Sequence, residues 1–200
     1  MIEQLIITTA RLVLTPLQID EASDLEASLG DPQVMRYVGS ALSRAEIDAA
    51  MPDLVRRGGG GALGIWLARE KAGGAVVGDG VLLPLPIEVD DTEWHLLDGG
   101  ASFPPRDIEV GYILREAAWG NGYATEICRA LLAFAFRQTP LEQVVAVTDP
   151  DNAASKHVLA KCGLIDHGLR RAYAETVTDF RISRATWQEQ RNLLRDDGEK

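Results

Sequence analysis

Two glycines one residue apart, directly before a long apolar helix, constrain this fold more than any other stretch. Residues 119–136 read WGNGYATEICRALLAFAF, and the strand-like run IEVGYIL occupies 108–114. Apolar residues three and four apart predict a helix that continues to about Gln138. A strand, a glycine turn and a helix in succession predict an α/β sheet with at least one helix packed against it.

The two glycines admit two explanations. A tight turn needs residues without a Cβ atom. Alternatively, a helix N-terminus exposes unpaired N–H groups with a partial positive charge, and glycines let the backbone approach an anionic group such as a phosphate. A dinucleotide-binding motif would need a third glycine where this chain has Thr125, which disfavours a nicotinamide cofactor. The glycines at 58–61 lack the lysine of a P-loop and predict a flexible loop.

The whole chain predicts a single domain, residues 1–200, of the α/β (α+β) class. Period-two runs between turns predict about seven strands in a mixed, mostly antiparallel sheet, and runs with helical spacing predict the helices that flank it. The strands are expected at 11–17, 63–70, 75–83, 108–114, 141–149, 165–172 and 175–185. The helices are expected at 19–29, 43–57, from the glycine loop to 138, and at 152–164, and a polar C-terminus follows the last strand.

Residues 84–107 interrupt this domain as a long insertion. The stretch PLPIEVDDTEWHLLDGGASFPPRD carries four prolines and six acids against one arginine. A loop of this length without evident structure is uncommon in a compact domain and is usually functional or disordered. Two interpretations stay open: a solvated excursion, or a lid over the site of a cationic acceptor.

The net charge of −10 disfavours nucleic acid and anionic membrane surfaces as partners. It would favour a cationic partner such as an amine, although solubility alone also explains it. No apolar run reaches the roughly 18 residues of a membrane span. The N-terminus has an early acid and no small-residue cleavage site, so we expect no signal peptide.

The cysteine and histidine pattern predicts no metal site. Cys128 and Cys162 both fall in apolar helical contexts, and the three histidines are scattered. Neither residue type shows the spacing of metal ligands. Two such cysteines are typical of a reduced, cytoplasmic setting.

Several stretches together resemble the GNAT superfamily of acyl-CoA-dependent N-acyltransferases. They are the strand EVGYIL, the G-x-G-x-A pattern that follows it, and DPDNAASKHVLAKCGL at 149–164. The stretches TTARLVLTPLQIDEASDL, DPQVMRYVG and WGNGYATE resemble the RimJ/RimL-like branch, and the resemblance covers nearly the whole chain outside 84–107. It implies acetyl-CoA as co-substrate, an amine as acceptor, a possible homodimer, and a central strand pair that splays to form the CoA cleft.

The resemblance also implies which residues hold CoA. The glycine-loop amides would bind the pyrophosphate, the strand backbone would bind the thioester carbonyl and the pantetheine arm, and the next helix would hydrogen-bond that arm. In that order these residues are Gly120, Gly122, Ala124 and Thr125, then Ile113 and Leu114, and finally Asn152 and Ser155. For Ser155, a plain helix-surface hydroxyl is the alternative.

Acetyl transfer to an amine needs a proton acceptor, a donor for the tetrahedral oxyanion and a route for the thiol to leave. The resemblance assigns proton acceptance to Glu109 at the start of the strand, and an exposed strand-end acid is the alternative. The oxyanion donor would be a backbone N–H near Ile113 or Leu114. Many relatives have a tyrosine seven residues after the helix asparagine, where this chain has Leu159, so we assign no general acid.

Two functions therefore stand side by side. The first is an acetyl-CoA-dependent N-acetyltransferase that acts by direct transfer, without an acyl-enzyme, on a protein N-terminal amine or a small-molecule amine. The second is a non-catalytic CoA-binding or regulatory module of the same fold, for which Leu159 leaves room.

Overall fold

The computed structural model describes residues 5–196. The first four residues of the N-terminus, for which we expect no signal peptide, and the last four of the polar C-terminus lie outside the described part.

Eight strands form one sheet in the order β1-β2-β3-β4-β5-β6-β8-β7. Neighbouring strands are antiparallel except for β5 and β6. The expected mixed, mostly antiparallel fold is confirmed, with one strand more than expected because the two-residue β1 gave no sequence signal. The strands are β1 Ile7–Thr8, β2 Leu12–Pro16, β3 Gly64–Glu70, β4 Val76–Pro84, β5 Ile108–Leu114, β6 Gln143–Thr148, β7 Ile165–Ala172 and β8 Glu175–Ser183.

Helices connect these strands and lie on both faces of the sheet. The α-helices are α1 Ala22–Leu29, α2 Pro32–Met35, α3 Arg44–Leu54, α4 Tyr123–Gln138, α5 Ala153–Lys161 and α6 Arg184–Asp196. Short 3₁₀ turns occur at Gly59–Gly61, Trp94–Leu96 and Glu116–Ala118. No helix among the described residues is long and apolar enough to cross a membrane.

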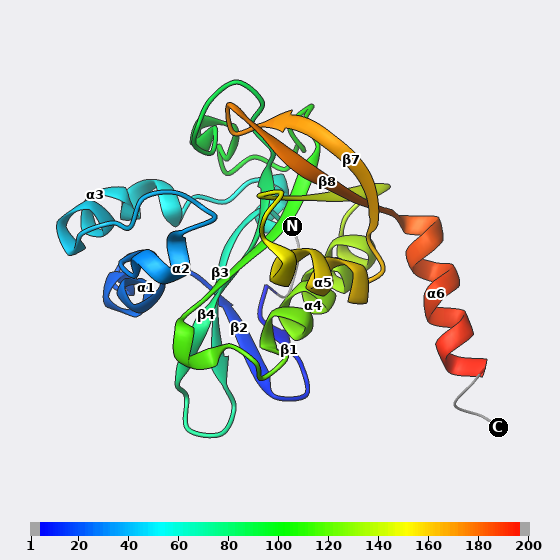
Figure 1. The fold of residues 1–200 in the computed structure, drawn as a ribbon, viewed down its shortest axis with the longest axis horizontal. Coiled ribbons are helices and arrows are strands. Elements are labelled where there is room, and N and C mark those ends of the chain that lie inside the picture. The colour runs from blue at the N-terminus through cyan, green and yellow to red at the C-terminus, as the bar shows by residue number, and fades with distance from the viewer. Residues whose placement is uncertain (1–4, 197–200) are drawn as a thin grey trace.

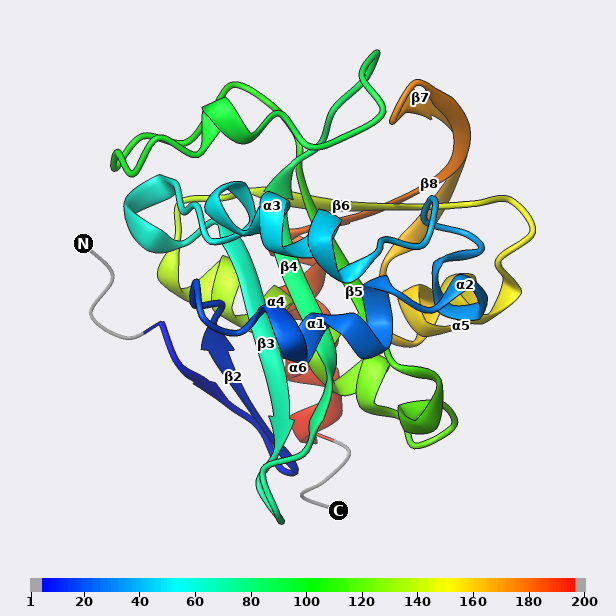
Figure 2. The same cartoon turned by 90° about the vertical axis from the view of Figure 1, so that its left-hand side faces the viewer.

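Two apolar clusters hold the helices to the sheet. α1 and α3 cover one face, where Leu25 and Ile47 pack with Leu67 of β3. α4 and α5 cover the other face, where Leu131 and Leu159 join the main core (Figures 1 and 2). One face of the central strands therefore looks toward α1 and α3, and the other looks toward α4 and α5.

α4 lies close to the centre of the sheet because β4 carries a glycine beneath it. A Cβ atom at Gly80 would come within 2.5 Å of Ile127 and 2.8 Å of Leu131. The buried residues of α4 recur three and four positions apart, which is the pattern that predicts this helix from the sequence. The close contact fixes the glycine-rich start of α4 beside the C-terminal end of β5.

The C-terminal helix α6 was not expected, because the polar sequence shows no continuous apolar stripe. It is held by tertiary contacts. The Trp187 ring lies 5.5 Å from that of Phe136 in α4, and Gln190 donates to the Gly163 carbonyl at 3.2 Å. Figure 1 shows α6 at the edge of the molecule, following β8.

The 84–107 insertion folds against the end of the sheet. Leu85 and Leu97 are 1% and 2% exposed and belong to the apolar core. The Leu85 N–H donates to the Asp107 carbonyl at 2.8 Å and ties the two ends of the insertion together. Figure 1 places the insertion beside the β7–β8 hairpin. The insertion is therefore anchored to the core at Leu85 and Leu97, while residues 87–91 are exposed.

Candidate active site

The central parallel strands separate along most of their length. β5 pairs with β4 at seven positions, but with β6 only at Glu109 and Val145. Beyond this pair the strands diverge toward their C-terminal ends, and the backbone of β5 has no strand partner on that side. The splayed strand pair expected from the sequence is confirmed.

Hydrogen bonds at both ends of the β4–β5 ladder show which backbone groups face the opening. Arg115 N–H donates to the Val77 carbonyl at 3.1 Å, and Leu85 N–H donates to the Asp107 carbonyl at 2.8 Å. Backbone groups alternate in direction along an antiparallel pair. The odd-numbered residues of β5 therefore turn their N–H and C=O groups to β4, and the even-numbered residues turn theirs toward the opening.

This alternation corrects one expectation. Ile113 is odd-numbered, and its carbonyl oxygen lies so close to β4 that a Cβ atom on Gly78 would collide with it. Ile113 is therefore not placed to offer its backbone to CoA. Tyr112 and Leu114, the second of which was expected, instead turn their backbone groups toward the opening. A sequence pattern alone does not give the register of the β4–β5 pair. It therefore does not show which of two adjacent β5 residues turns its backbone groups toward the opening.

Trp119 and Ser155 form hydrogen bonds with these two residues and so determine which of their groups stay free. The indole N–H of Trp119 donates to the Leu114 carbonyl at 2.9 Å, which leaves the Leu114 N–H for a ligand. The Tyr112 side chain reaches α5, where its hydroxyl lies 3.2 Å from the Ser155 hydroxyl. Burial raises the pKa of Tyr112. The expected Ser155 thus lies at the splay and does not protrude as a free surface hydroxyl.

The glycine loop leaves the start of α4 open. Gly120 and Gly122 have φ angles of 76° and 77°, in the left-handed region that favours glycine. A Cβ atom at Gly120 would meet no atom within 4 Å, and no side chain caps α4. The first amides of the helix, at Ala124 and Thr125 among others, therefore lack a partner within the helix. The turn requires the glycines, and the same turn leaves room for an anion.

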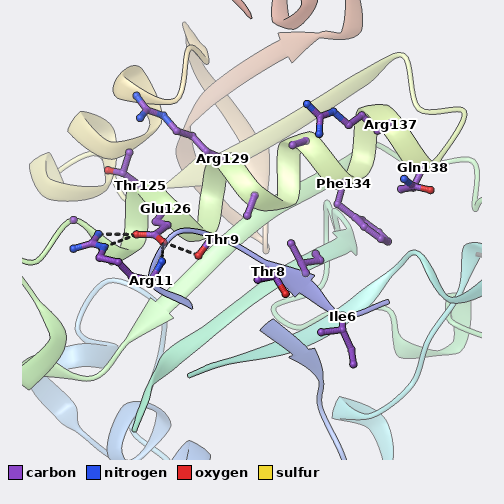
Figure 3. Close-up of a pocket in the computed structure, with 14 residues that line it drawn as sticks. Ile6, Thr8, Thr9, Arg11, Thr125, Glu126, Arg129, Phe134, Arg137 and Gln138 are labelled. Carbon is purple, nitrogen blue, oxygen red and sulfur yellow. Dashed lines mark hydrogen bonds and ion pairs between the residues drawn. The ribbon is translucent and has the colours of Figure 1, made fainter. Parts of the chain in front are cut away.

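Arg11 anchors this loop from the β1–β2 turn (Figure 3). Its guanidinium binds the Glu126 carboxylate of α4 at 2.7 Å and donates to the Asn121 carbonyl, between the two glycines, at 2.8 Å. Thr9 donates to the same carboxylate at 2.6 Å. Burial alone would raise the pKa of Glu126, but the hydrogen bonds from Thr9 and Arg11 lower it. Arg11 therefore neutralises the negative charge nearest to the helix start, and sequence reasoning missed it.

A groove of about 710 Å³ runs between β1 and α4. Figure 3 shows Arg129 and Arg137 of α4 along it. The groove meets the expected pyrophosphate residues only at Gly122 and Thr125. It lies on the outer side of α4, and we take the splay, where unpaired strand backbone is available, as the centre of the candidate site.

α5 presents its start to the splay. The Asn152 side chain caps this helix by accepting from the Ser155 N–H at 3.0 Å. Seven residues after Asn152, Leu159 is 1% exposed and belongs to the core. At the position where the family resemblance implies a tyrosine, this chain therefore has an apolar side chain that packs in the core.

Glu109 lies at the point where β5 and β6 meet. It is 5% exposed, so the alternative of an exposed strand-end acid is wrong. Its carboxylate accepts a hydrogen bond from the Tyr173 hydroxyl. Burial raises the pKa of Glu109 to about 7, while the Tyr173 hydrogen bond and the charge of Arg170 oppose this rise. A carboxyl with such a pKa accepts and releases a proton near neutral pH.

Asp79 is a second buried acid on the same face of the sheet, and no sequence signal pointed to it. It pairs in register with Ile113 of β5 and is 4% exposed. Its Oδ2 has no hydrogen-bond partner among the described residues, and burial raises its pKa to about 7. An unpaired buried carboxyl destabilises a fold, which makes Asp79 a costly feature beside the site.

The described part of the chain holds no group of three or more His, Cys, Asp or Glu side chains that could bind a metal ion. Cys128 and Cys162 are both free and buried.

A protein-family comparison decides the class of the molecule. The family described as acetyltransferase (GNAT) domain matches residues 11–165, from β2 to the start of β7. The chain belongs to the GNAT acetyltransferase family. As expected from the sequence, this GNAT protein is an acetyl-CoA-dependent N-acetyltransferase.

Individual relatives and solved structures are similar to this chain in sequence or in fold. The FsC-acetyl coenzyme A-N(2)-transacetylase of Aspergillus fumigatus is 30% identical over 78% of this GNAT chain and 63% of its own length. A GNAT-family acetyltransferase structure from Bacillus anthracis has a TM-score of 0.70 at 16% identity, over 90% of this chain and 99% of its own. A structure named as a putative ribosomal-protein-serine acetyltransferase from Vibrio cholerae has a TM-score of 0.62 at 20% identity, over 92% and 99%.

Proposed function

We propose that this enzyme acetylates a primary amine by direct transfer from acetyl-CoA, with Glu109 as the proton acceptor. One observation carries the proposal: a carboxyl whose pKa is raised to about 7 lies at the apex of a splay that opens toward an uncapped helix start. The first feature suits proton removal from an ammonium group, and the second suits a phosphorylated co-substrate. Glu109 belongs to β5, and the uncapped helix start belongs to α4, the next α-helix in the chain.

The co-substrate would lie along the opening of the splay. The amides of Gly120, Gly122, Ala124 and Thr125 would bind its pyrophosphate, Asn152 and Ser155 its pantetheine arm, and Tyr112 and Leu114 that arm and the thioester carbonyl. Bound acetyl-CoA supplies the activated acetyl group. The residues fit, because the loop has space for an anion at Gly120 and the backbone groups of Tyr112 and Leu114 lie beyond the single β5–β6 pair and lack a strand partner.

Glu109 would act on the acceptor. An ammonium group must lose a proton before its nitrogen attacks the thioester carbonyl, and Glu109 would take that proton directly or through water. A backbone N–H of Tyr112 or Leu114 would donate to the oxyanion that forms. The thiol of CoA, with a pKa of roughly 8.5, leaves without strong assistance. This agrees with Leu159 at the position of the relatives' tyrosine.

The acceptor is a primary amine of a peptide or of a small molecule. The net charge of −10 favours the approach of a cation. The RimJ/RimL-like stretches and the likeness to the Vibrio cholerae structure favour a protein N-terminal amine. A cytoplasmic location and a homodimer remain predictions, and light scattering of the purified chain would test the second.

The buried Leu159 favours a second candidate, a CoA-binding module without catalysis. Thiol release from acetyl-CoA, measured with N-terminal peptides, diamines and aminoglycosides, separates the two functions. We expect acetylated product by mass spectrometry with at least one acceptor class. Heat on titration with CoA but no thiol release with any amine would favour the non-catalytic module.

A glycine variant tests the binding site itself. Gly122→Val should abolish the heat of CoA binding, because a β-branched residue does not tolerate the required φ and would crowd the loop. Gly73→Val is the matched control, since Gly73 also has a positive φ and open space around it but lies in the β3–β4 turn. Equal CoA affinity in both variants would contradict the proposed pyrophosphate site.

A further inference from the structure

Tyr173 is placed at the tip of the β7–β8 hairpin by an unusual backbone. Tyr173 and Ala174 have φ angles of 52° and 54°, in the left-handed region where residues other than glycine are rare. A two-residue hairpin turn of this kind is normally built from Asn-Gly or similar pairs. Such strain is often kept where a side chain has a task.

The side chain of Tyr173 points into the candidate site. Its hydroxyl donates to the Glu109 carboxylate, 64 residues earlier in the chain, and its ring packs with Leu85, Val145 and Ala172. The contact spans from the β7–β8 hairpin to the apex of the splay. Glu109 and Tyr173 are far apart in the sequence, and the order of the strands in the sheet brings them together.

The same hairpin is tied to the insertion. The Tyr173 N–H donates to the Pro86 carbonyl at 3.3 Å, and the Ala174 N–H donates to the Ile87 carbonyl at 3.0 Å. Thr92, also of the insertion, lowers the pKa of Tyr173, and the charge of Asp91 raises it. Tyr173 therefore contacts both the insertion and Glu109.

We propose that Tyr173 is a positioning residue: it holds the Glu109 carboxylate at the apex of the splay and links it to the 84–107 insertion. The proposal rests on the proposed role of Glu109. Tyr173 would not exchange a proton with the acceptor, because its hydroxyl is engaged with Glu109 and burial raises its own pKa well above the usual value.

The groups around Glu109 determine how its pKa should change when the Tyr173 hydroxyl is removed. Arg170 of β7 lowers the pKa of Glu109, but it is shared with Asp107 at 3.0 Å and with Asp179 of β8 at 3.4 Å. The charge of Asp91 raises the pKa of Tyr173. Within this set the Tyr173 hydroxyl is the direct hydrogen-bond donor to the carboxylate, and its loss should raise the pKa of Glu109.

Tyr173→Phe tests the proposal because it removes the hydroxyl and keeps the ring and the backbone. The limb of kcat/KM that rises with Glu109 ionisation should move about one pH unit upward, which lowers activity on its acid side about tenfold. The KM for acetyl-CoA should stay unchanged. Tyr37→Phe is the matched control and should leave the profile where it is. The double variant Glu109→Gln, Tyr173→Phe should show no further loss beyond Glu109→Gln.

Carboxyl NMR of ¹³C-glutamate-labelled protein gives a readout without turnover. The Glu109 signal, assigned through its absence in Glu109→Gln, should titrate at higher pH in Tyr173→Phe than in the wild type. An unchanged Glu109 titration, or an equal loss of activity from Tyr173→Phe in the Glu109→Gln background, would overturn the proposal. If no amine is acetylated but the titration moves, the proposed function fails while the Tyr173–Glu109 link holds.

Discussion

At the scale of single residues, two buried carboxyls on the neighbouring strands β4 and β5 distinguish this molecule. Glu109 on β5 pairs with Leu83 on β4, and Leu83 lies four residues after Asp79 on the same strand. Paired residues and residues an even number of positions apart share a face of the sheet, so Glu109 and Asp79 face the same side. Burial raises the pKa of both to about 7. Glu109 has a hydrogen-bond donor, and the Oδ2 of Asp79 has none among the described residues.

Glu109→Gln should abolish most turnover at neutral pH. The wild-type kcat/KM should rise with pH through about 7, as Glu109 ionises. The variant should lose this limb and about a hundredfold in rate, within the usual range for a general base. Calorimetry with CoA should give wild-type affinity, because the cofactor residues are untouched. Turnover that is unchanged at every pH would remove Glu109 from the mechanism.

Asp79→Asn should stabilise the protein, and more so at high pH. The folded-state pKa of Asp79, about 7, exceeds its ordinary value of 3.8, so the folded state binds the proton more tightly. Wild-type stability therefore falls as pH rises from about 4 to about 7 through this group. We expect a gain of about 1–2 kcal/mol in the free energy of unfolding at pH 8.

The gain from Asp79→Asn should shrink at pH 5, where Asp79 is already neutral in the folded state. Urea unfolding of both proteins at the two pH values measures this difference, and the contribution of Glu109 cancels because it is present in both. The same gain at pH 5 and pH 8 would show that Asp79 carries no raised pKa.

At the scale of elements, the start of α4 depends on the β1–β2 turn. Arg11 contacts both the Glu126 carboxylate and the Asn121 carbonyl, and its guanidinium lies 4.5 Å from the centre of the Tyr123 ring. It thereby fixes the loop conformation and cancels a negative charge where the proposed pyrophosphate would bind. An unpaired Glu126 in the first turn would repel that group.

Arg11→Met should weaken CoA binding about tenfold, because it uncovers the Glu126 charge near the helix start. Adding Glu126→Gln to this variant should restore part of the affinity. Arg44→Met is a suitable control, since Arg44 forms exposed ion pairs with Asp48 and Glu26 away from the loop. Isothermal titration with CoA measures all four proteins, and no difference between Arg11→Met and Arg44→Met would refute the role of Arg11.

At the scale of the whole molecule, the insertion is part of the core. Leu97 packs in the main apolar cluster, and Arg57, which follows α3, accepts the Gly99 N–H on its carbonyl at 2.9 Å. The insertion therefore links the region after α3 to the β7–β8 hairpin and to Glu109. Removing 84–107 as a whole would damage the fold, so point changes give the cleaner test.

Leu97→Ala should cost about 2–4 kcal/mol in the free energy of unfolding, as is usual for a buried leucine. Ile87→Ala in the same insertion should cost less than about 0.5 kcal/mol, because Ile87 is 42% exposed. Thermal or urea unfolding of the two variants compares them directly. A small effect of Leu97→Ala would mean that the insertion is not integral to the core.

The sequence by itself determined the strand–glycine loop–helix unit, the β3–β4 hairpin and the helix that begins after Asn152. These features depend on neighbouring residues: apolar spacing, glycine at a positive φ, and the asparagine at a helix start. They are encoded locally, and the structure has their elements within a few residues of the expected bounds.

Only the tertiary structure decided the rest of the site. The register of β4 against β5 turned Tyr112 and not Ile113 toward the opening, and the sheet order buried Glu109 beneath Tyr173. The pairing of Arg11 with Glu126, separated by 115 positions, and the packing of α6 arise in the same way. Each depends on which distant segments meet, and that depends on the combined packing of the whole core rather than on any local pattern.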